Sequence, residues 1–225
     1  MAEKIVFDES SEKYYENGVD HGILAVINSE GKYGEVVPWN GLTSVSQSPE
    51  GGEAEDIYAD NIKYASLTST ENFKATINAY TYPDEFAECD GSTSIGSKGG
   101  LLIGQQKRSH FGFAYRTNKG NADGKSYHII HIVYNCLANP SEREYTTVND
   151  SPEAIEFSWE VTSTPASAEY NNVNYTTSHV TIDESINVSL YKTIEDSLYG
   201  DGTNTPTFLT LKEVFEKVKA QEAQA

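Results

Sequence analysis

Cysteine is scarce in this sequence of 225 residues, which contains only Cys89 and Cys136. The opening stretch MAEKIVFDESSEKYY is charged and has no apolar signal core, so we expect a chain made and folded in a cytoplasm. Thiols stay reduced there, which predicts two buried, free cysteines and no disulfide framework.

Long apolar runs are also missing. No stretch approaches the roughly 20 apolar residues of a membrane span, and we expect no membrane partner.

Positive charge is scarce as well. Sixteen Lys and Arg stand against 34 Asp and Glu, which gives a formal net charge of −18. The stretch EGGEAEDIYADN, residues 50–61, carries five carboxylates and no cation. Ordinary nucleic-acid binding relies on Lys and Arg that neutralise phosphates, so this balance argues against that class of protein. It favours solubility and resists non-specific association.

The motifs of catalytic and metal sites are missing too. GSTSIGSK, residues 91–98, approaches a phosphate-binding loop, but Ser97 stands where the motif needs lysine, which favours a connector. There is no G-x-S-x-G motif, and the acidic stretch lacks EF-hand order. His128 and His131 form an H-x-x-H on an expected strand, where they would point to opposite faces, so we interpret them as packed or hydrogen-bonded histidines. We predict no enzyme, no cofactor and no metal, with a weak surface cation site in the acidic stretch as the alternative.

Period-two alternation dominates the middle of the chain and predicts strands. In AIEFSWEV one face carries apolar residues (Ile155, Phe157, Trp159, Val161) and the other polar ones (Glu156, Ser158, Glu160). Residues 126–136 are apolar on both faces. They are expected to pair with residues 110–117, because Asp123-Gly124 is a strong turn signal. Further strands are expected at residues 23–27, 42–47, 57–67 and 73–80.

Helical signals occur at three places. Pro83 followed by acidic residues predicts a short helix over about 83–90, ended by Gly91. Tyr191, Ile194 and Leu198 share one helical face, and LTLKEVFEKVK near the end offers Thr210 and Glu213 as a capping box. The sequence therefore predicts a mainly β chain. We divide it into a β domain, residues 1–182 with a long loop at about 46–60, and a C-terminal arm, residues 183–225, with two helices.

QKRSHFGFAYR contains the one basic cluster, formed by Lys107, Arg108, His110 and Arg116. Aromatic residues interleave with these cations, as on surfaces that bind single-stranded nucleic acid. Three firm cations in a chain of −18 would grip phosphate poorly. We therefore interpret Lys107, Arg108 and Arg116 as an intersubunit patch for an acidic neighbour, such as another copy of this protein.

Four stretches are informative together: NAYTYPDEFAECDG (78–91), HIVYNCLANPSEREYTTVNDSPEAIEFSWEVTSTP (131–165), HVTIDESINVSLYKTIEDSLYG (179–200) and LTLKEVFEKV (209–218). The second joins an Asn139-Pro140-Ser141 turn to Asn149-Asp150-Ser151-Pro152 and then to a Phe-x-Trp strand. In order and spacing, across most of the chain, these stretches resemble the major tail protein, or tail tube protein, of long-tailed bacteriophages, particularly those of Gram-positive hosts.

The resemblance implies a β-sandwich or barrel-like domain with a flanking helix. Such subunits close into hexameric rings that stack into a hollow tube, through which the genome passes into the host. It further implies a virion protein assembled in the bacterial cytoplasm. Its expected partners are other copies of itself and the tape measure, tail tip and tail terminator proteins, while phage DNA passes without specific binding.

This implied role suggests a use for the negative charge, because an acidic bore would repel DNA phosphates at distances up to a Debye length, about 10 Å. The candidates for the lumen wall are the polar strand residues Glu156, Ser158 and Glu160, which would face outer solvent in the simpler alternative. The candidates for a loop that reaches a neighbouring ring are Glu50, Gly51, Gly52, Glu53, Glu55 and Asp56.

Two other functions stay open. The chain could be a monomeric β-sandwich module that binds carbohydrate or a cell surface, with exposed aromatic residues on one sheet as its signature. A hydrolase whose site is dispersed in the sequence is the third hypothesis, which the missing motifs disfavour.

Overall fold

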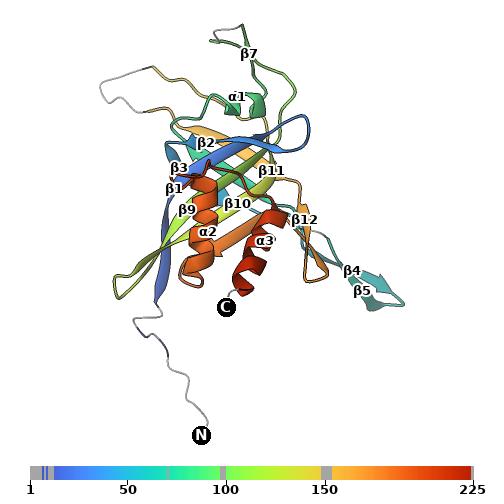
Figure 1. Cartoon of the computed structure of the whole chain (residues 1–225). Helices are drawn as coiled ribbons and strands as arrows, with labels where there is room; N and C mark the ends of the chain where they lie inside the picture. The colour runs from blue at the N-terminus through green and yellow to red at the C-terminus, as the bar shows by residue number, and fades with distance from the viewer. Residues whose placement is uncertain are drawn as a thin grey trace.

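A computed structural model describes residues 7, 9, 13–69, 71–96, 100–147 and 154–223. Strands make up 49 % of the described residues and helices 14 %, so the predicted mainly β class is confirmed (Figure 1). No helix in these described ranges has the length and apolar character needed to cross a membrane. The predicted turn at Asn149–Pro152 lies outside the described residues.

One antiparallel sheet forms the body of the molecule. Its strands follow the order β2-β1-β9-β10-β11-β6-β3, and β14 pairs with β10 off this path. The strands of this sheet are β1 (Tyr14–Ile27), β2 (Tyr33–Trp39), β3 (Leu42–Gln47), β6 (Lys74–Ala79), β9 (Phe111–Asn121), β10 (Ser126–Ala138), β11 (Phe157–Ser163) and β14 (His179–Asp183).

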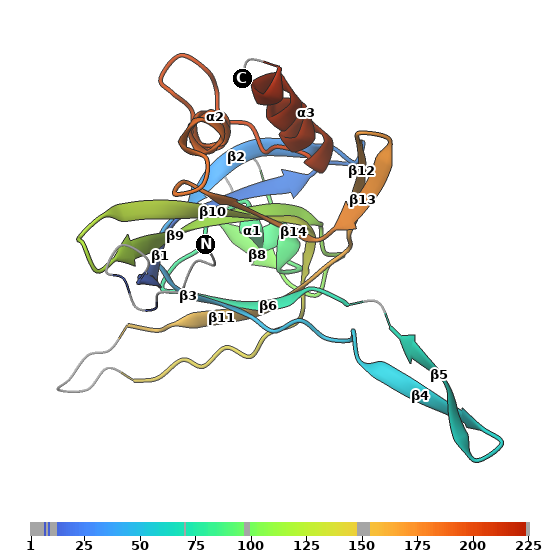
Figure 2. The same cartoon turned by 90° about the horizontal axis from the view of Figure 1, so that it is seen from below.

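The sheet bends back on itself into a sandwich. Trp39 on β2 and Trp159 on β11 are separated by three strands in the sheet order, yet their ring centroids lie 5.5 Å apart. Figure 2 shows the result, with β3, β6 and β11 forming a layer that faces β1, β9 and β10. The helix α1 (Phe86–Cys89) lies within the predicted range and places the Phe86 ring 4.5 Å from that of Trp39. Aromatic packing therefore holds the two layers together.

The two cysteines lie in this sandwich core, and both are free and buried, as predicted. Strand β10 contributes to two cores at once, because Val133 and Cys136 face the sandwich interior while Ile130 and Ile132 face the opposite side. The pattern of apolar residues on both faces is thereby explained. The predicted β9–β10 hairpin is confirmed, and Gly124 in its turn has the positive φ of 79° that favours glycine.

Helices α2 (Val188–Tyr199) and α3 (Leu211–Glu222) cover the outer face of the β1–β9–β10–β14 layer (Figure 2). Ile194, Leu198 and Val214 share a buried core with Ile130 and Ile132 of the sheet. The two helices predicted for the C-terminal arm, residues 183–225, are therefore present, and they pack on the β domain. Amphipathic helices of this length bury their apolar stripe against the nearest apolar face, here the sheet.

The ends of these helices follow from local sequence. Asn187 caps α2 by accepting a hydrogen bond from the Leu190 amide. The predicted capping box of α3 is confirmed, since Thr210 and Glu213 exchange hydrogen bonds between side chain and backbone.

Three two-stranded hairpins complete the fold: β4 (Ala54–Ala59) with β5 (Ile62–Thr68), β7 (Thr93–Ile95) with β8 (Leu101–Ile103), and β12 (Ala166–Tyr170) with β13 (Val173–Thr177). The first corrects two predictions, because residues 46–60 are not one long loop and residues 57–67 are not one strand. Asp60 and Asn61 have φ of 51° and 63°, the positive values of the turn that closes a two-residue hairpin. The chain reverses there, and the acidic segment becomes a strand.

Candidate assembly surfaces

The outer face of the β3–β6–β11 layer carries polar residues on all three strands. The helices lie on the other side of the body (Figure 2). On β11 the predicted alternation is confirmed, with Trp159 and Val161 buried while Ser158 is exposed and Glu160 half-buried. Ser158 pairs with Asn78 of β6, and Asn78 donates a 2.9 Å hydrogen bond to Ser44 of β3. Hydroxyl, amide and carboxylate groups thus form one band across three strands, from Ser44, Ser46, Thr76, Asn78, Ser158 and Glu160.

The charge on this polar band is partly neutralised. Lys74 of β6 lies 3.1 Å from Glu160 and 2.8 Å from Glu50, so Glu50 belongs to the margin of this face. A 2.7 Å hydrogen bond from Asn139 and the nearby Lys74 lower the pKa of Glu160. Glu156 accepts a hydrogen bond from the Thr43 hydroxyl. Lys74 was missed from the sequence because it reaches this face from a different strand, and it makes the band less anionic than expected.

The β4–β5 hairpin projects away from the body (Figure 1), and its strand register gives it a polar and an apolar face. Asp56 accepts a 2.8 Å hydrogen bond from Ser66 and pairs with Lys63 at 2.6 Å on the polar face. Ile57 and Leu67 belong to residue pairs adjacent to Asp56–Ser66 and therefore lie on the other face. With Ile62, which pairs with Ala59 on the same face, they form what we call the arm stripe, whose side chains are between 41 % and 64 % exposed.

The six candidates for the loop do not lie together on this arm. Glu55 and Asp56 are on β4, and Glu53 directly precedes it. Glu50, Gly51 and Gly52 lie at the base, where Glu50 forms a bridge with Asn72 and the Gly52 amide donates to the Ser69 hydroxyl. Only the second half of the predicted set is therefore presented by the hairpin.

Two of the three cations of the predicted basic patch have partners within the subunit. Nε and Nη2 of Arg116 donate to the two carboxylate oxygens of Asp20 at 2.8 and 3.1 Å, and Arg116 lies 3.4 Å from Glu195 of α2. Burial opposes ionisation of Asp20, but the hydrogen bonds and the charge of Arg116 outweigh burial and lower the pKa of the Asp20 carboxyl. Arg108 donates to the Ala138 carbonyl at 2.8 Å and faces Asp90. Both arginines hold the fold together, and Lys107 is left as the exposed member.

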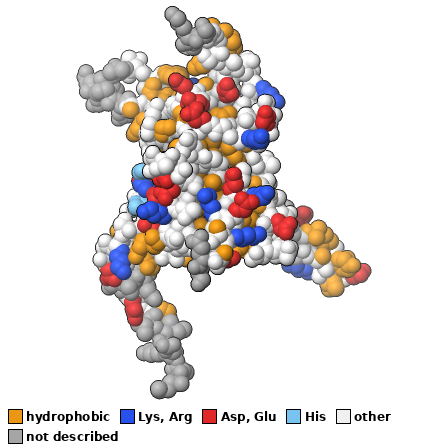
Figure 3. Space-filling model, in the orientation of Figure 1, with side chains coloured by type: hydrophobic (Ala, Val, Ile, Leu, Met, Phe, Trp, Pro, Cys, Tyr) orange, Lys and Arg blue, Asp and Glu red, His pale blue; other side chains and the backbone are white. Residues whose placement is uncertain are grey.

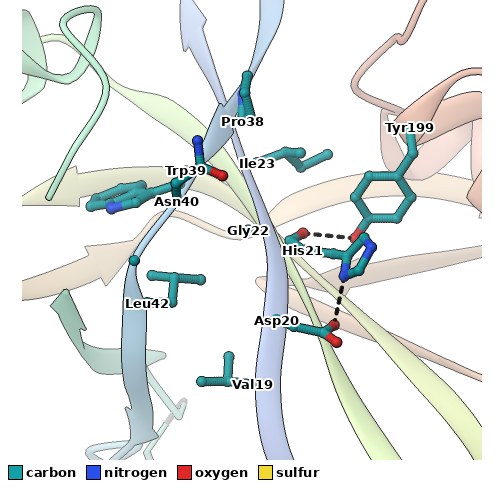
Figure 4. Close-up of a pocket in the computed structure, with 11 residues that line it drawn as sticks. Val19, Asp20, His21, Gly22, Ile23, Pro38, Trp39, Asn40, Leu42 and Tyr199 are labelled. Atoms are coloured by element: carbon teal, nitrogen blue, oxygen red, sulfur yellow. Dashed lines mark hydrogen bonds and ion pairs between the residues drawn. The ribbon is translucent and has the colours of Figure 1, made fainter. Parts of the chain in front are cut away.

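A hollow of about 420 Å³ lies beside the Arg116 pair, between the β1 bulge, the β2–β3 turn and the end of α2 (Figure 4). His21 lies 2.9 Å from Asp20, and the Tyr199 hydroxyl donates to the His21 carbonyl at 3.0 Å. Its lining includes no Ser, Thr, Cys or Lys that the His21–Asp20 pair could activate as a nucleophile. The other side of the hollow is apolar, so its chemistry suits contact with an apolar side chain.

A histidine pair was missed from the sequence. Nδ1 of His131 lies 3.2 Å from Nε2 of His179, and the His131 ring stacks on Tyr115 with centroids 4.6 Å apart. The pKa of both imidazoles is lowered to about 4, by burial at each and, at His131, also by the neighbouring His179. His128 pairs instead with Glu184 at 3.1 Å, so the H-x-x-H histidines have separate partners, as predicted. Within the described ranges, no group of three or more His, Cys, Asp or Glu could hold a metal ion.

No protein-family model matches the chain, and no curated protein matches it.

Proposed function

We propose that this protein is a structural subunit that self-assembles into stacked, hexameric rings, which form the tail tube of a long-tailed bacteriophage. Its role is mechanical, without catalysis or a cofactor. It would be assembled in the host cytoplasm and remain in the virion tail. Its partners there are further copies of itself and the tape measure, tail tip and tail terminator proteins. The proposal begins from the resemblance of the four sequence stretches and is supported by three features of the fold.

The observation that carries the proposal is the polar band on the β3–β6–β11 layer. One side of the sandwich is covered by α2 and α3, whereas the opposite face carries Ser, Thr, Asn and Glu side chains (Figure 2). Such a face suits the wall of a water-filled channel. Lys74 is held by Glu50 and Glu160, so it offers DNA phosphates little free positive charge. Glu156, Ser158 and Glu160 are our lumen residues in this proposal.

The ends of the sheet support ring closure. Strands β2 and β3 end the strand order, so within the described chain each has one edge without a sheet partner. Unpaired backbone N–H and C=O groups at such edges are available to pair with another chain. In a closed ring the edge of one subunit can meet that of the next, which removes the free edges.

The β4–β5 hairpin supports stacking of rings. Isolated two-stranded hairpins are at best marginally stable in water, and this one also exposes the arm stripe. An exposed apolar stripe on a projecting arm is typical of a contact made in an assembly. We assign this contact to a subunit in the adjacent ring.

Purified protein should be examined by negative-stain electron microscopy and sedimentation velocity at about 0.15 M salt, where the Debye length is near 8 Å. We expect rings or tubes with a stain-filled centre. A protein that stays strictly monomeric at high concentration would contradict the proposal. Saturable binding of that monomer to a carbohydrate or to host cells would then favour the binding-module alternative.

A further inference from the structure

A second apolar hairpin lies at the other end of the molecule. In β7–β8 the pairs Thr93–Ile103 and Ile95–Leu101 share one face. Ile95, Leu101 and Ile103 are 46 %, 58 % and 45 % exposed. We call these three side chains the cap stripe. Strands of three residues cannot bury this surface themselves, so the cap stripe needs a partner.

The cap stripe and the arm stripe are placed far apart on the body. Figure 1 shows β7 at the top of the molecule and β4–β5 at its lower right, and Figure 3 shows hydrophobic side chains on that lower projection. One copy therefore cannot cover its own cap stripe with its own arm. A second copy placed end to end brings the two stripes within reach.

The charges around the two stripes are complementary. Glu53, Glu55 and Asp60 flank the arm stripe and are exposed. The described part of the β7–β8 hairpin contains no acidic residue, and exposed Lys107 follows β8 by four positions. Complementary charges at the rim of an apolar contact fix its orientation and speed association.

The third hairpin, β12–β13, provides a contrast within the same chain. Its Tyr170 and Tyr175 rings pack on Phe215 of α3, with centroids 5.4 and 5.9 Å apart. The subunit itself thus covers part of the apolar surface of that hairpin, and Val173 and Tyr175 stay 50 % and 48 % exposed. Ala168 of β12 also belongs to a buried core, whereas no described residue of the other two hairpins does.

We propose that the cap stripe of one subunit is the docking surface for the arm stripe of a second copy, with Lys107 facing the acids of the arm. This inference rests on the proposed function, since it places the second copy in the adjacent ring. The two surfaces differ, so the contact is head-to-tail and repeats without limit. A stack of rings grows from such a contact, whereas a self-complementary contact would stop at a pair.

The contact can be tested by cross-linking variants with one added cysteine, Ile62→Cys on the arm and Leu101→Cys at the start of β8. Wild-type protein supplies the background, because Cys89 and Cys136 are buried. With a short bismaleimide, a mixture of the two variants should give a covalent dimer, and the double variant a ladder of higher oligomers. Val173→Cys on β12–β13 is the matched control and should give no more dimer than wild type when mixed with Ile62→Cys.

Charge reversal tests the orientation. Lys107→Glu should reduce the cross-linked dimer about tenfold at low salt, and adding Glu55→Lys on the arm should restore it. Two results would overturn the docking surface. One is a dimer yield that Lys107→Glu leaves unchanged, and the other is an equal dimer yield when Ile62→Cys is mixed with Val173→Cys or with Leu101→Cys.

Stacking gives a second readout. The double change Leu101→Ser and Ile103→Ser should leave single rings and abolish tubes, while Val173→Ser keeps both. Tubes of normal length from the cap variant would overturn the docking proposal alone. If wild type forms neither rings nor tubes, the proposed function fails. The cross-linking yield then still decides whether arm and cap meet.

Discussion

The imidazoles of His131 on β10 and His179 on β14 are hydrogen-bonded to each other, with Nδ1 and Nε2 3.2 Å apart. One ring must donate and the other accept, so the accepting nitrogen must be unprotonated and the bond is lost once both rings are charged. A second hollow lies beside the pair, and Glu16, Asp183 and Gln47 line it together with the two histidines. The bond therefore depends on pH, which leads to the first prediction.

The pH prediction follows from the lowered pKa values. Both histidines have an ordinary pKa of 6.5 and a folded pKa of about 4, so folding favours their neutral forms. Their contribution to stability is complete above pH 6.5 and is lost as pH falls through 4. We expect a loss on the order of 2 kcal/mol between pH 7 and pH 4, after a discount for solvent screening.

Urea unfolding at a series of pH values measures this loss. The double variant His131→Gln and His179→Gln should show a shallower decline between pH 6.5 and 4 than wild type. His110→Gln, which changes an exposed histidine, should follow the wild-type curve. Parallel curves for wild type and the double variant would exclude the pair as the cause.

Removing Arg116 should destabilise the fold. Arg116→Met leaves Asp20 partly buried without its bidentate partner, and we expect a loss of about 2 kcal/mol in the free energy of unfolding. Adding Asp20→Asn should recover part of it, because the uncompensated carboxylate is gone. A double-mutant cycle by chemical denaturation measures the coupling. A coupling of zero would mean that the pair contributes nothing.

Truncating a side chain at the centre of the sandwich should reduce the free energy of unfolding more than the other substitutions. Trp159 is 1 % exposed and its ring lies within 5.5 Å of those of Trp39, Phe86 and Tyr82. Trp159→Ala should cost about 3–5 kcal/mol by cavity formation. Trp159→Phe keeps a ring and should cost less. Thermal unfolding monitored by circular dichroism ranks the two, and equal losses would contradict a packing origin.

The cap of α3 allows a smaller, local test. Thr210→Ala removes the side chain that accepts from the Glu213 amide, and we expect a loss of about 1 kcal/mol. Thr205→Ala in the preceding loop is the control and should change stability little. Equilibrium unfolding of both variants makes the comparison. An equal effect at the two sites would argue against the capping box as its source.

The proposed channel wall predicts a change in DNA binding. Glu156→Lys with Glu160→Lys adds free cations beside Lys74, so assembled tubes should retain on the order of tenfold more short double-stranded DNA at low salt. Glu169→Lys with Glu216→Lys adds the same charge on the helical side. Co-sedimentation measures the bound DNA. Equal retention by the two double variants would remove Glu156 and Glu160 from the channel wall.

Features encoded by neighbouring residues could be predicted from the sequence. The alternation around Trp159, the turn at Asp123-Gly124 and the box of Thr210 and Glu213 each depend on spacings of a few residues. The β4–β5 hairpin was missed because the turn at Asp60-Asn61 interrupts a run that looks like one strand. Asp and Asn both tolerate the positive φ of such a turn, so this pair of residues did carry a local turn signal.

Contacts between distant parts of the chain could not be predicted, because no short spacing in the sequence indicates them. Arg116 and Asp20 are 96 residues apart, and His131 and His179 are 48 apart. Charge counting therefore treated Arg116 as a free cation, and the H-x-x-H pattern directed attention to His128 instead of His179. The packing of α2 and α3 on the sheet was missed for a related reason. An apolar stripe predicts that a helix face is buried, but it does not identify the surface that covers that face.

Both tryptophans of the chain lie in the sandwich core, at 2 % and 1 % exposure, while the arm and cap hairpins contain none. Indole fluorescence should therefore shift when the subunit unfolds and stay silent when subunits join. Light scattering should rise when subunits join and should change little when a single subunit unfolds. Recording the two signals on one sample separates the folding of this protein from its polymerisation without attaching a dye.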